Sequence, residues 1–277
     1  MNIGEIRKIK QILEMYGARP NADLGQNFLI DSKYLDAAIE AAAPLEGKTV
    51  LEIGPGMGVL TRKLSKVADE VIAVEVDGRM ISILKTMCLK CTNLTVREMD
   101  IRKFDPTDIG DYKIVANLPY YLTTHVIRKF LEEKNKPEQM VVMVQKEVAE
   151  RICARPNKMN MLGISVQFYG EPTLITVVPR EAFYPTPQVN SAIVRINLYG
   201  SPLFTDVDPD RFFRLIKAGF GEKRKQLINS LSVLGKDREE LVRLLNLSEI
   251  DPQRRPETLS LSEWHIFYKN FYSQPRR

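Results

Sequence analysis

A short strand that runs into a glycine-rich turn is the strongest local signal for chemistry in this 277-residue chain. Residues 51–58 read LEIGPGMG, and a helical pattern follows them. Glycines let the backbone approach a ligand closely, and the first turn of a helix offers unpaired N–H groups. The glycines are Gly54, Gly56 and Gly58, whereas a dinucleotide fingerprint of the form G-x-G-x-x-G would need glycine in place of Val59. The turn therefore predicts a nucleotide-type ligand other than a dinucleotide, and an ordinary tight turn is the alternative.

Two carboxylates stand at the ends of the next two predicted strands. Glu75 ends the second strand, 21 residues after Gly54, and Asp100 follows the third. The first can accept hydrogen bonds from both ribose hydroxyls of an adenosine cofactor, and the second can accept one from an adenine amine. The glycine turn resembles the E-x-G-x-G-x-G turn of S-adenosylmethionine (SAM) methyltransferases, whose cofactor has no phosphate. We expect both acids to bind such a cofactor, although either acid alone would more often be a solvated loop residue.

The sequence Asn117-Leu-Pro-Tyr120 directly follows the fourth predicted strand. Methyl transfer to an exocyclic adenine amine is difficult because the nitrogen lone pair is delocalised into the ring. An asparagine oxygen and a backbone carbonyl beside a proline can accept the two amine protons and localise that lone pair, while an aromatic ring stacks on the base. Asn117, the carbonyl of Leu118 or of Pro119, and Tyr120 supply these groups. The segment predicts an adenine-amine site, and a plain strand-to-helix turn is the alternative.

Short apolar strands that alternate with helices must position these groups. After an amphipathic helix in the first twenty residues, strands are predicted at residues 49–53, 70–76, 94–98, 113–116, 140–144, 174–178 and 191–198. This alternation is typical of a doubly wound α/β sheet, and the last two strands, with no helix between them, predict an antiparallel edge. Turn residues then interrupt the chain, and only helical patterns follow. We expect a Rossmann-like α/β domain at residues 1–202 and a small all-helical domain at residues 203–277.

Composition limits the class of protein. Apolar residues make up 44% of the chain and charged residues 27%, as in ordinary soluble domains. No stretch reaches the roughly 18 apolar residues of a membrane span, and no signal peptide is recognisable, so we expect a cytoplasmic protein without a membrane partner. Three cysteines disfavour a disulfide framework. Cys88 and Cys91 have C-x-x-C spacing but too few companions for the roughly four ligands of a zinc site, so no metal is expected.

Basic side chains concentrate in residues 211–225, which read RFFRLIKAGFGEKRK. This stretch has six basic side chains and one acidic one, so its net charge equals the +5 of the whole chain. Such a cluster is typical of a surface that follows nucleic-acid phosphates, and a solvated helix face is the alternative. The predicted RNA-contacting residues are Arg214, Lys217, Lys223, Arg224 and Lys225.

Motifs spread over most of the chain resemble one family, the ribosomal RNA adenine N6-dimethyltransferases of the bacterial small-subunit type. They are Asp100 and the segments LGQNFLID (24–31), LEIGPGMGVLT (51–61), VIAVEVD (71–77), NLPYYLTTHVI (117–127), FYPTPQVNSAIV (183–194) and FGEKRKQLINSL (220–231). The resemblance implies SAM as cofactor. It implies dimethylation of the N6 amines of two adjacent adenines in the hairpin near the 3′ end of 16S ribosomal RNA, within the immature small subunit. We expect the enzyme to be a monomer.

The resemblance also assigns cofactor contacts to single residues. It implies that Asn27 and Leu29 close over SAM and that Gly54 contacts its methionine part. Glu75 would hold the ribose, and Asp100 would hold the adenine amine. These roles agree with the positions of the two acids at strand ends.

The target site would contain three further groups. The resemblance implies that Asn117 touches both cofactor and target, and that Phe183 is a second aromatic wall against the flipped adenine, opposite Tyr120. Two aromatic faces would offset the cost of taking a base out of its stack. For Phe183, packing in the core is the alternative.

Two other functions fit many of the same motifs. One is the antibiotic-resistance type of methyltransferase, which acts on an adenine of 23S ribosomal RNA and shares the QNFL segment and the glycine turn. The other is a ribosome assembly factor that has kept the fold without catalysis. The segment PGMGVLT and the long helical tail favour the small-subunit enzyme over the 23S type. The intact acids and the intact NLPY segment favour an enzyme over a factor without catalysis.

Overall fold

The computed structural model describes residues 3–222 and 225–273. The chain divides into two compact units, each built from two segments. The first unit comprises Met1–Ala149 and Glu171–Gly200, and the second comprises Glu150–Gly170 and Ser201–Arg277. The limit after Gly200 lies close to the domain boundary expected at residue 202. The segment 150–170 differs from the expectation, because it joins the second unit.

Aromatic packing explains where this segment belongs. Phe168 lies 5.2 Å from the rings of both Phe212 and Phe213, measured between centroids. Tyr169 stacks on Phe213 at 6.2 Å. Large aromatic side chains contribute much of the buried apolar area of a core. Residues 150–170 therefore complete the core of the second unit, which no local sequence pattern indicates.

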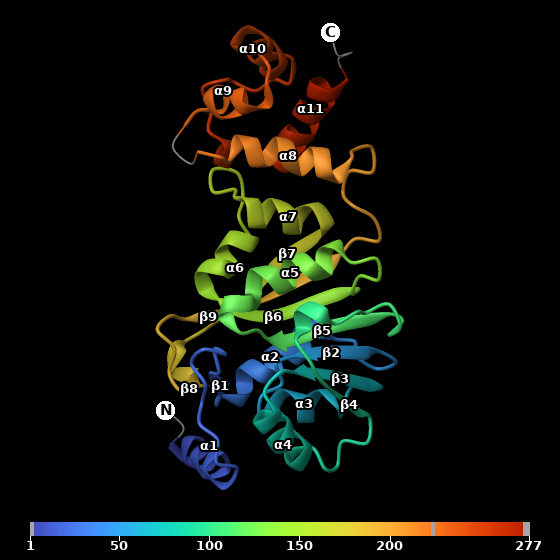
Figure 1. Ribbon diagram of the computed structural model, residues 1–277, viewed down its shortest axis with the longest axis vertical. Helices are drawn as coiled ribbons and strands as arrows, with labels where there is room; N and C mark the ends of the chain where they lie inside the picture. Colours follow the sequence, from blue (N-terminus) through green and yellow to red (C-terminus); the bar gives the residue numbers. More distant parts are fainter. Residues whose placement is uncertain (1–2, 223–224, 274–277) are drawn as a thin grey trace. The chain divides into compact units, whose positions relative to one another are not determined.

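Seven strands form the sheet of the first unit, in the order β4-β3-β2-β5-β6-β9-β7 (Figure 1). Their bounds are β2 (Thr49–Ile53), β3 (Glu70–Glu75), β4 (Leu94–Glu98), β5 (Tyr112–Asn117), β6 (Gln139–Gln145), β7 (Gly170–Val178) and β9 (Ser191–Leu198). Strands β4, β3, β2, β5 and β6 are parallel, and β9 is antiparallel to β6. All seven predicted strands and the α/β class are thus confirmed.

The apolar composition of the central strands explains why they form the interior of the sheet. Val50, Ile72, Val115 and Val141 are at most 2% exposed, as expected of parallel strands that are covered on both faces. The strand order reverses between β2 and β5, because β3 follows on one side and β5 on the other. Sheets of this type bind ligands at the carboxyl ends of the strands beside such a reversal.

Helices connect the strands of this sheet, and two of the α-helices begin at an aspartate cap. They are α1 (Ile3–Met15), α2 (Ser32–Ala42), α3 (Val59–Leu64), α4 (Gly78–Met87), α5 (Thr123–Glu132), α6 (Lys146–Ile152) and the short η1 (Ile101–Lys103), η2 (Tyr120–Leu122) and η3 (Arg180–Ala182). Helix α2 packs on β5, β6 and β9, and α4 packs on β3 and β4. Asp31 caps α2 and Asp77 caps α4, each by accepting a hydrogen bond from a backbone N–H of the first turn.

A second, two-stranded sheet joins distant parts of the first unit. Strand β1 (Phe28–Leu29) pairs antiparallel with β8 (Phe183–Tyr184). The backbone N–H of Ile30 continues this connection by donating to the carbonyl of Ala182 at 2.8 Å. The QNFL segment is therefore held by the segment that contains Phe183.

The described part of the second unit consists of helices, as expected. They are α7 (Met161–Tyr169), α8 (Pro209–Gly219), α9 (Leu227–Ser230), η4 (Leu231–Leu234), α10 (Arg238–Leu247), η5 (Pro256–Thr258) and α11 (Leu261–Tyr272). Helix α11 packs on α7, α8 and α10. It contacts α8 at Gly219, where a Cβ atom would lie 2.4 Å from the ring of Trp264. A capping box formed by Ser260 and Glu263 begins α11.

Candidate active site

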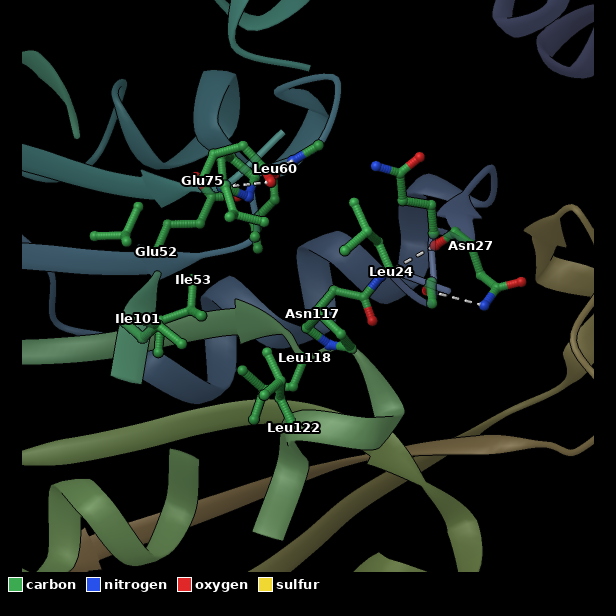
Figure 2. A pocket seen from close by; sticks show the side chains of 18 of the residues that line it. Leu24, Asn27, Glu52, Ile53, Leu60, Glu75, Ile101, Asn117, Leu118 and Leu122 are labelled. Carbon is green, nitrogen blue, oxygen red and sulfur yellow. Dashed lines mark hydrogen bonds between the residues drawn. The ribbon is translucent and has the colours of Figure 1, made fainter. Parts of the chain in front are cut away.

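One pocket of the first unit lies at the carboxyl ends of β2, β3, β4 and β5, on both sides of the reversal in strand order (Figure 2). This is where a ligand is expected in such a sheet. Nine of the ten residues predicted for cofactor binding or catalysis line it: Asn27, Leu29, Gly54, Glu75, Asp100, Asn117, Leu118, Pro119 and Tyr120. The fold therefore brings together groups from five separate segments of the sequence.

The glycine turn between β2 and α3 forms one wall of this pocket. Gly54 and Gly56 have φ angles of +66° and +55°, which residues with a side chain rarely adopt. A Cβ atom on Gly56 would lie 3.3 Å from the Phe28 ring, and one on Gly54 would lie 3.6 Å from Cδ of Pro119. The two glycines thus let the turn pack directly against the QNFL segment and the NLPY segment.

The carboxylate of Glu75 is held in one orientation at the end of β3. Its Oε1 accepts from the backbone N–H groups of Val76 at 2.8 Å and Asp77 at 3.0 Å, and its Oε2 accepts from that of Gly56 at 3.3 Å. Burial raises the pKa of Glu75, although these three hydrogen bonds oppose the rise. A carboxylate oxygen can accept about two hydrogen bonds, so Oε2 keeps capacity for a further donor. Glu75 is therefore oriented as an acceptor for hydroxyl groups.

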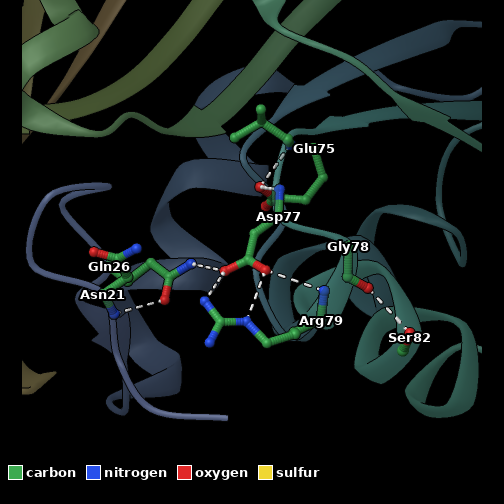
Figure 3. A network of polar contacts seen from close by, with 8 residues as sticks. Asn21, Gln26, Glu75, Asp77, Gly78, Arg79 and Ser82 are labelled. Carbon is green, nitrogen blue, oxygen red and sulfur yellow. Dashed lines mark hydrogen bonds and ion pairs between the residues drawn. The ribbon is translucent and has the colours of Figure 1, made fainter.

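A polar network ties the first residue of the QNFL segment to the start of α4 (Figure 3). Gln26 Nε2 donates to Asp77 Oδ2 at 3.1 Å, and Gln26 Oε1 accepts from the backbone N–H of Asn21 at 2.9 Å. Arg79 donates to the same Asp77 carboxylate from its backbone at 3.0 Å and from Nε at 3.2 Å. Burial acts to raise the pKa of Asp77, but the hydrogen bonds from Arg79 and Gln26 outweigh it and hold that pKa below its ordinary value. An ionised carboxylate thus anchors the loop that covers the pocket.

Asp100 lies after β4 and is held by Arg102. The Arg102 backbone N–H donates to Oδ1 at 2.9 Å, and Nε of the same residue donates to Oδ2 at 2.9 Å. The side-chain hydrogen bond from Arg102 is the main reason that the pKa of Asp100 is lowered. Asp100 is therefore an ionised acceptor at neutral pH. Arg102 and Tyr121 line the same pocket, and no sequence pattern predicted either, because an exposed arginine or tyrosine is common in loops.

The side chain of Asn117 is oriented by the loop that covers the pocket. Its Nδ2 donates to the backbone carbonyl of Asn27 at 3.4 Å. This leaves Oδ1 as the group that can accept a hydrogen bond from a ligand. The end of β5 and the covering loop thus form one arrangement, in which the position of Asn27 sets the direction of the Asn117 amide.

The structure distinguishes the carbonyls of Leu118 and Pro119, either of which could be the second acceptor by sequence alone. The Pro119 carbonyl accepts from the backbone N–H of Leu122 at 3.0 Å and from Oγ1 of Thr123 at 3.3 Å. The Leu118 carbonyl accepts a hydrogen bond from none of the described residues. The carbonyl of Leu118 is therefore the second available acceptor beside Asn117.

Tyr120 lies in η2, next to these acceptors. Its hydroxyl shares a hydrogen bond of 2.8 Å with Oγ of Ser191, which is fully buried at the start of β9. Burial raises the pKa of Tyr120 more than the Ser191 hydrogen bond lowers it. The phenol is thus neutral at physiological pH, and its ring is held at the edge of the pocket.

Phe183 occupies a different position from the one expected. It is 1% exposed and packs in the core with Leu29, Val178 and Ile193, and it does not line the pocket. The pairing of β8 with β1 places Phe183 opposite Leu29 and directs it into the core. Phe183 thus packs in the core in this structure, and its role as a second aromatic wall stays a prediction.

Glu52 also lines the pocket, although no role was expected for it. It lies in β2, is 1% exposed, and its Oε2 has no hydrogen-bond partner among the described residues. Burial raises the pKa of Glu52 to about 8, while the nearby Thr61 hydroxyl opposes that rise without completing a hydrogen bond of regular geometry. An acid inside an otherwise apolar strand was the signal that could have identified it.

The predicted RNA-contacting residues belong to the second unit. Arg214 and Lys217 are exposed on α8 and line a groove with side chains of α9 and η4. Lys225 is exposed and pairs with a neighbouring glutamate at 2.8 Å. Lys223 and Arg224 lie outside the described residues. The exposed positions on α8 are compatible with contacts to phosphates.

Two further observations concern classes of site. In residues 3–222 and 225–273, no helix has the length and apolar character needed to cross a membrane. The same residues contain no cluster of three or more His, Cys, Asp or Glu side chains that could hold a metal ion.

The two cysteines with C-x-x-C spacing have separate surroundings. Cys88 packs close to Gly58, and burial raises the pKa of its thiol. Cys91 accepts a hydrogen bond from Ser65 at 3.1 Å.

Solved structures with the same architecture define the class. A dimethyladenosine transferase from Plasmodium falciparum matches 89% of this chain and 98% of its own, with 29% identity and a TM-score of 0.76. The 23S rRNA methyltransferase ErmE matches 88% of this chain and 99% of its own, with 24% identity and a TM-score of 0.74, a likeness of fold. Together with the sheet order and the pocket, these matches define a class I SAM-dependent methyltransferase.

Sequence relatives specify the family. The family described as ribosomal RNA adenine dimethylase matches residues 17–267. A protein named ribosomal RNA small subunit methyltransferase A from Dehalococcoides mccartyi strain BAV1 is 47% identical over 271 residues, which are 96% of this chain and 93% of that protein. A protein of the same name from Clostridioides difficile strain 630 is 39% identical, over 93% of this chain and 92% of its own. The chain belongs to the ribosomal RNA adenine dimethylase family, and it is an enzyme that uses SAM to dimethylate adenine in ribosomal RNA.

Proposed function

We propose that this enzyme dimethylates the N6 amines of two adjacent adenines in the hairpin near the 3′ end of 16S ribosomal RNA, within the immature small subunit. Relatives whose names specify the small subunit support this substrate, with identity of up to 47% over 96% of the chain. The observation that carries the chemistry is a pair of acceptors, Oδ1 of Asn117 and the carbonyl of Leu118, in one pocket with the acids Glu75 and Asp100.

The residues of the pocket fit SAM as the methyl donor. Glu75 would accept from the ribose hydroxyls, because its carboxylate is fixed by three backbone N–H groups and keeps free acceptor capacity. Asp100 would accept from the adenine amine, since it is ionised beside its arginine partner. Gly54 would leave room for the methionine part, and Asn27 and Leu29, which line the same pocket, would cover it. When bound, SAM supplies a methyl group on a positively charged sulfur.

The acceptors prepare the adenine amine for attack. Asn117 Oδ1 and the Leu118 carbonyl would accept hydrogen bonds from its two N–H groups, which would draw the nitrogen toward sp³ geometry and localise its lone pair toward the methyl carbon. The nitrogen would form a bond to this carbon as the carbon–sulfur bond breaks, and the proton released from the resulting cation would pass to water. Tyr120 would stack on the base. A strong base is not required, because the proton becomes acidic only after the attack.

The second unit would position the RNA. Arg214 and Lys217 present exposed positive charge on α8, and residues 223–225 add three more basic side chains in the sequence. Contacts of this kind go to phosphates, so they fix orientation without reading sequence. The target would then be selected by RNA shape and by the base that enters the pocket.

We also propose that the enzyme is a cytoplasmic monomer. The proposed substrate exists where bacterial ribosomal subunits are assembled. One chain carries the groups proposed for the cofactor and for the target amine, all in the first unit. The sedimentation of the purified enzyme at several concentrations measures its oligomeric state, and a stable dimer would contradict the proposal.

A methyl-transfer assay tests the function. Purified enzyme is incubated with labelled SAM and small ribosomal subunits that lack the modification, and primer extension then locates the product. We expect label at two adjacent adenines near the 3′ end of 16S RNA. Asn117→Ala should lower kcat about 100-fold, as loss of a group that orients or stabilises the transition state does, and Glu75→Ala should mainly raise the KM for SAM.

A variant in the second unit serves as the matched control. Asn246→Ala, which removes an exposed amide from α10, should leave the rate unchanged. No transfer to small subunits by the wild-type enzyme would refute the proposed reaction. Transfer to large-subunit RNA instead would assign the enzyme to the 23S-specific type.

A further inference from the structure

An open groove lies at the same edge of the main sheet as the target site, at the ends of β6 and β9. It is formed by the end of β6, the start of α6, the residue that begins η3 and the segment that enters β9. Its polar side chains are Gln145, Lys146, Glu147, Arg180, Gln188 and Asn190. Neither the cofactor contacts nor the methyl transfer described above uses any of these residues.

The groove shares a wall with the target site. Asn117 on β5 is paired with Met143 on β6, and Gln145 lies two residues further along β6 toward the same edge. With about 3.3 Å per residue and about 4.8 Å between strands, the Cα atoms of Asn117 and Gln145 are about 8 Å apart. Ser191, whose hydroxyl bonds to Tyr120 at 2.8 Å, directly follows Asn190. A nucleotide joined to a base in the target site can therefore reach the groove.

The amides in the groove are available to a ligand. The side chains of Gln145 and Gln188 have no hydrogen-bond partner among the described residues. Oδ1 of Asn190 accepts from the backbone N–H of Arg180 at 3.0 Å, which fixes this side chain and leaves its Nδ2 for another partner. Side-chain amides carry both a donor and an acceptor, the pattern that pairs with the edge of an adenine. Val189, which is 45% exposed, adds an apolar surface for the face of a base.

Two basic side chains lie beside these amides. Lys146 and Arg180 are exposed at the groove, against one acid, Glu147. Arg180 pairs with Glu181 at 3.1 Å, and both side chains are about half exposed. An exposed pair of this kind is weak in water, so it can exchange for a phosphate contact.

We propose that this groove binds the nucleotide next to the adenine being methylated, with Gln145 and Gln188 reading its base and Arg180 and Lys146 contacting its phosphate. The inference rests on the proposed function, because in a substrate with two adjacent adenines each target adenine has the other adenine as one of its two neighbours. The enzyme would then select a pair of adenines, since the base outside the target site is recognised together with the base inside it.

The test varies the neighbouring base and the amides together. Small subunits are reconstituted with 16S RNA in which one of the two adenines is replaced by guanine, cytosine or uracil. The value of kcat/KM is measured for methylation of the remaining adenine, with wild type, Gln145→Ala, Gln188→Ala and the double variant. Gln11→Ala, an exposed glutamine on α1, is the matched control.

Wild type and control should prefer an adenine neighbour by about tenfold, the discrimination expected of one good amide–adenine pair. The double variant should lose this preference while keeping the rates with the other bases. Arg180→Ala should lower all rates by a similar factor and reduce the slope of log affinity against log salt by about 1.

Contrary results separate the two proposals. If wild type methylates all substrates equally well, or if the double variant keeps the wild-type preference, the groove does not read the neighbour, while the proposed function stands. If wild type transfers no methyl group even to the unaltered small subunits, the proposed function fails and this inference fails with it. A double variant that loses activity equally with every neighbour would also overturn the base-reading role.

Discussion

Replacing Glu52 by glutamine should stabilise the protein at alkaline pH. The carboxyl group is fully buried in β2, and burial raises its pKa from 4.5 to about 8. A difference of about 3.5 pK units corresponds to about 5 kcal/mol between the protonated and ionised forms in the folded state. Because the folded-state pKa is the higher one, this contribution to stability is fully present below pH 4.5 and is lost as the pH rises through 8. Glutamine has nearly the same volume and no proton to lose, so its variant lacks this pH dependence.

Urea unfolding followed by far-UV circular dichroism measures the effect. The free energy of unfolding is determined for wild type and Glu52→Gln from pH 5 to pH 9. The difference between the two proteins should shift by about 4 kcal/mol in favour of the variant over this range. Glu46→Gln, at an exposed position in the loop before β2, should run parallel to wild type. Parallel profiles for Glu52→Gln as well would refute the reasoning, because they would mean that the buried carboxyl titrates equally in the folded and unfolded chains.

Three further substitutions test packing and the covering loop. Gly58→Ala places a Cβ atom on a residue at φ +81°, 2.5 Å from Cδ1 of Leu84. This substitution should lower the free energy of unfolding in urea by about 2–4 kcal/mol. An unchanged unfolding midpoint would mean that the turn is looser than described. Gly219→Ala puts a Cβ atom 2.4 Å from the Trp264 ring and should cost about 1–3 kcal/mol, measured through the fluorescence of this single tryptophan; equal stability would contradict the close contact. Gln26→Ala removes the 3.1 Å hydrogen bond to the carboxylate that caps α4 and should weaken S-adenosylhomocysteine binding about tenfold in calorimetry; unchanged affinity would show that the loop is held by other contacts.

Much of the fold is predictable from local sequence patterns. All seven strands of the main sheet are visible. The buried parallel strands are short apolar runs, and the more exposed β4 and β7 are visible through their β-branched residues. Strands β1 and β8 are not visible, since two residues show no periodicity and these strands exist only through their mutual pairing. The position of residues 150–170 is also hidden, because the partners of Phe168 lie about forty residues further along the chain.

The site is predictable where a residue with a suitable functional group lies at the end of a strand. Glu75, Asp100 and Asn117 each lie at or just after the carboxyl end of a strand of the parallel sheet, so the topology brings them to one pocket. The choice of the Leu118 carbonyl depends on the hydrogen bonds of the next turn, which the residue types do not specify. The core position of Phe183 depends on long-range pairing, which no local sequence pattern indicates.

The pairing of β1 with β8 also bears on the synthesis of the protein. Leu29 is paired with Phe183, a residue that the ribosome adds about 150 positions later. The glycine turn and both cofactor acids are thus translated long before the segment that holds the covering loop in place. During most of its synthesis the nascent chain lacks this closure, and contacts so distant in sequence form slowly. We therefore expect the growing polypeptide to acquire tight binding of the methyl donor only near the end of translation, once β8 has left the exit tunnel.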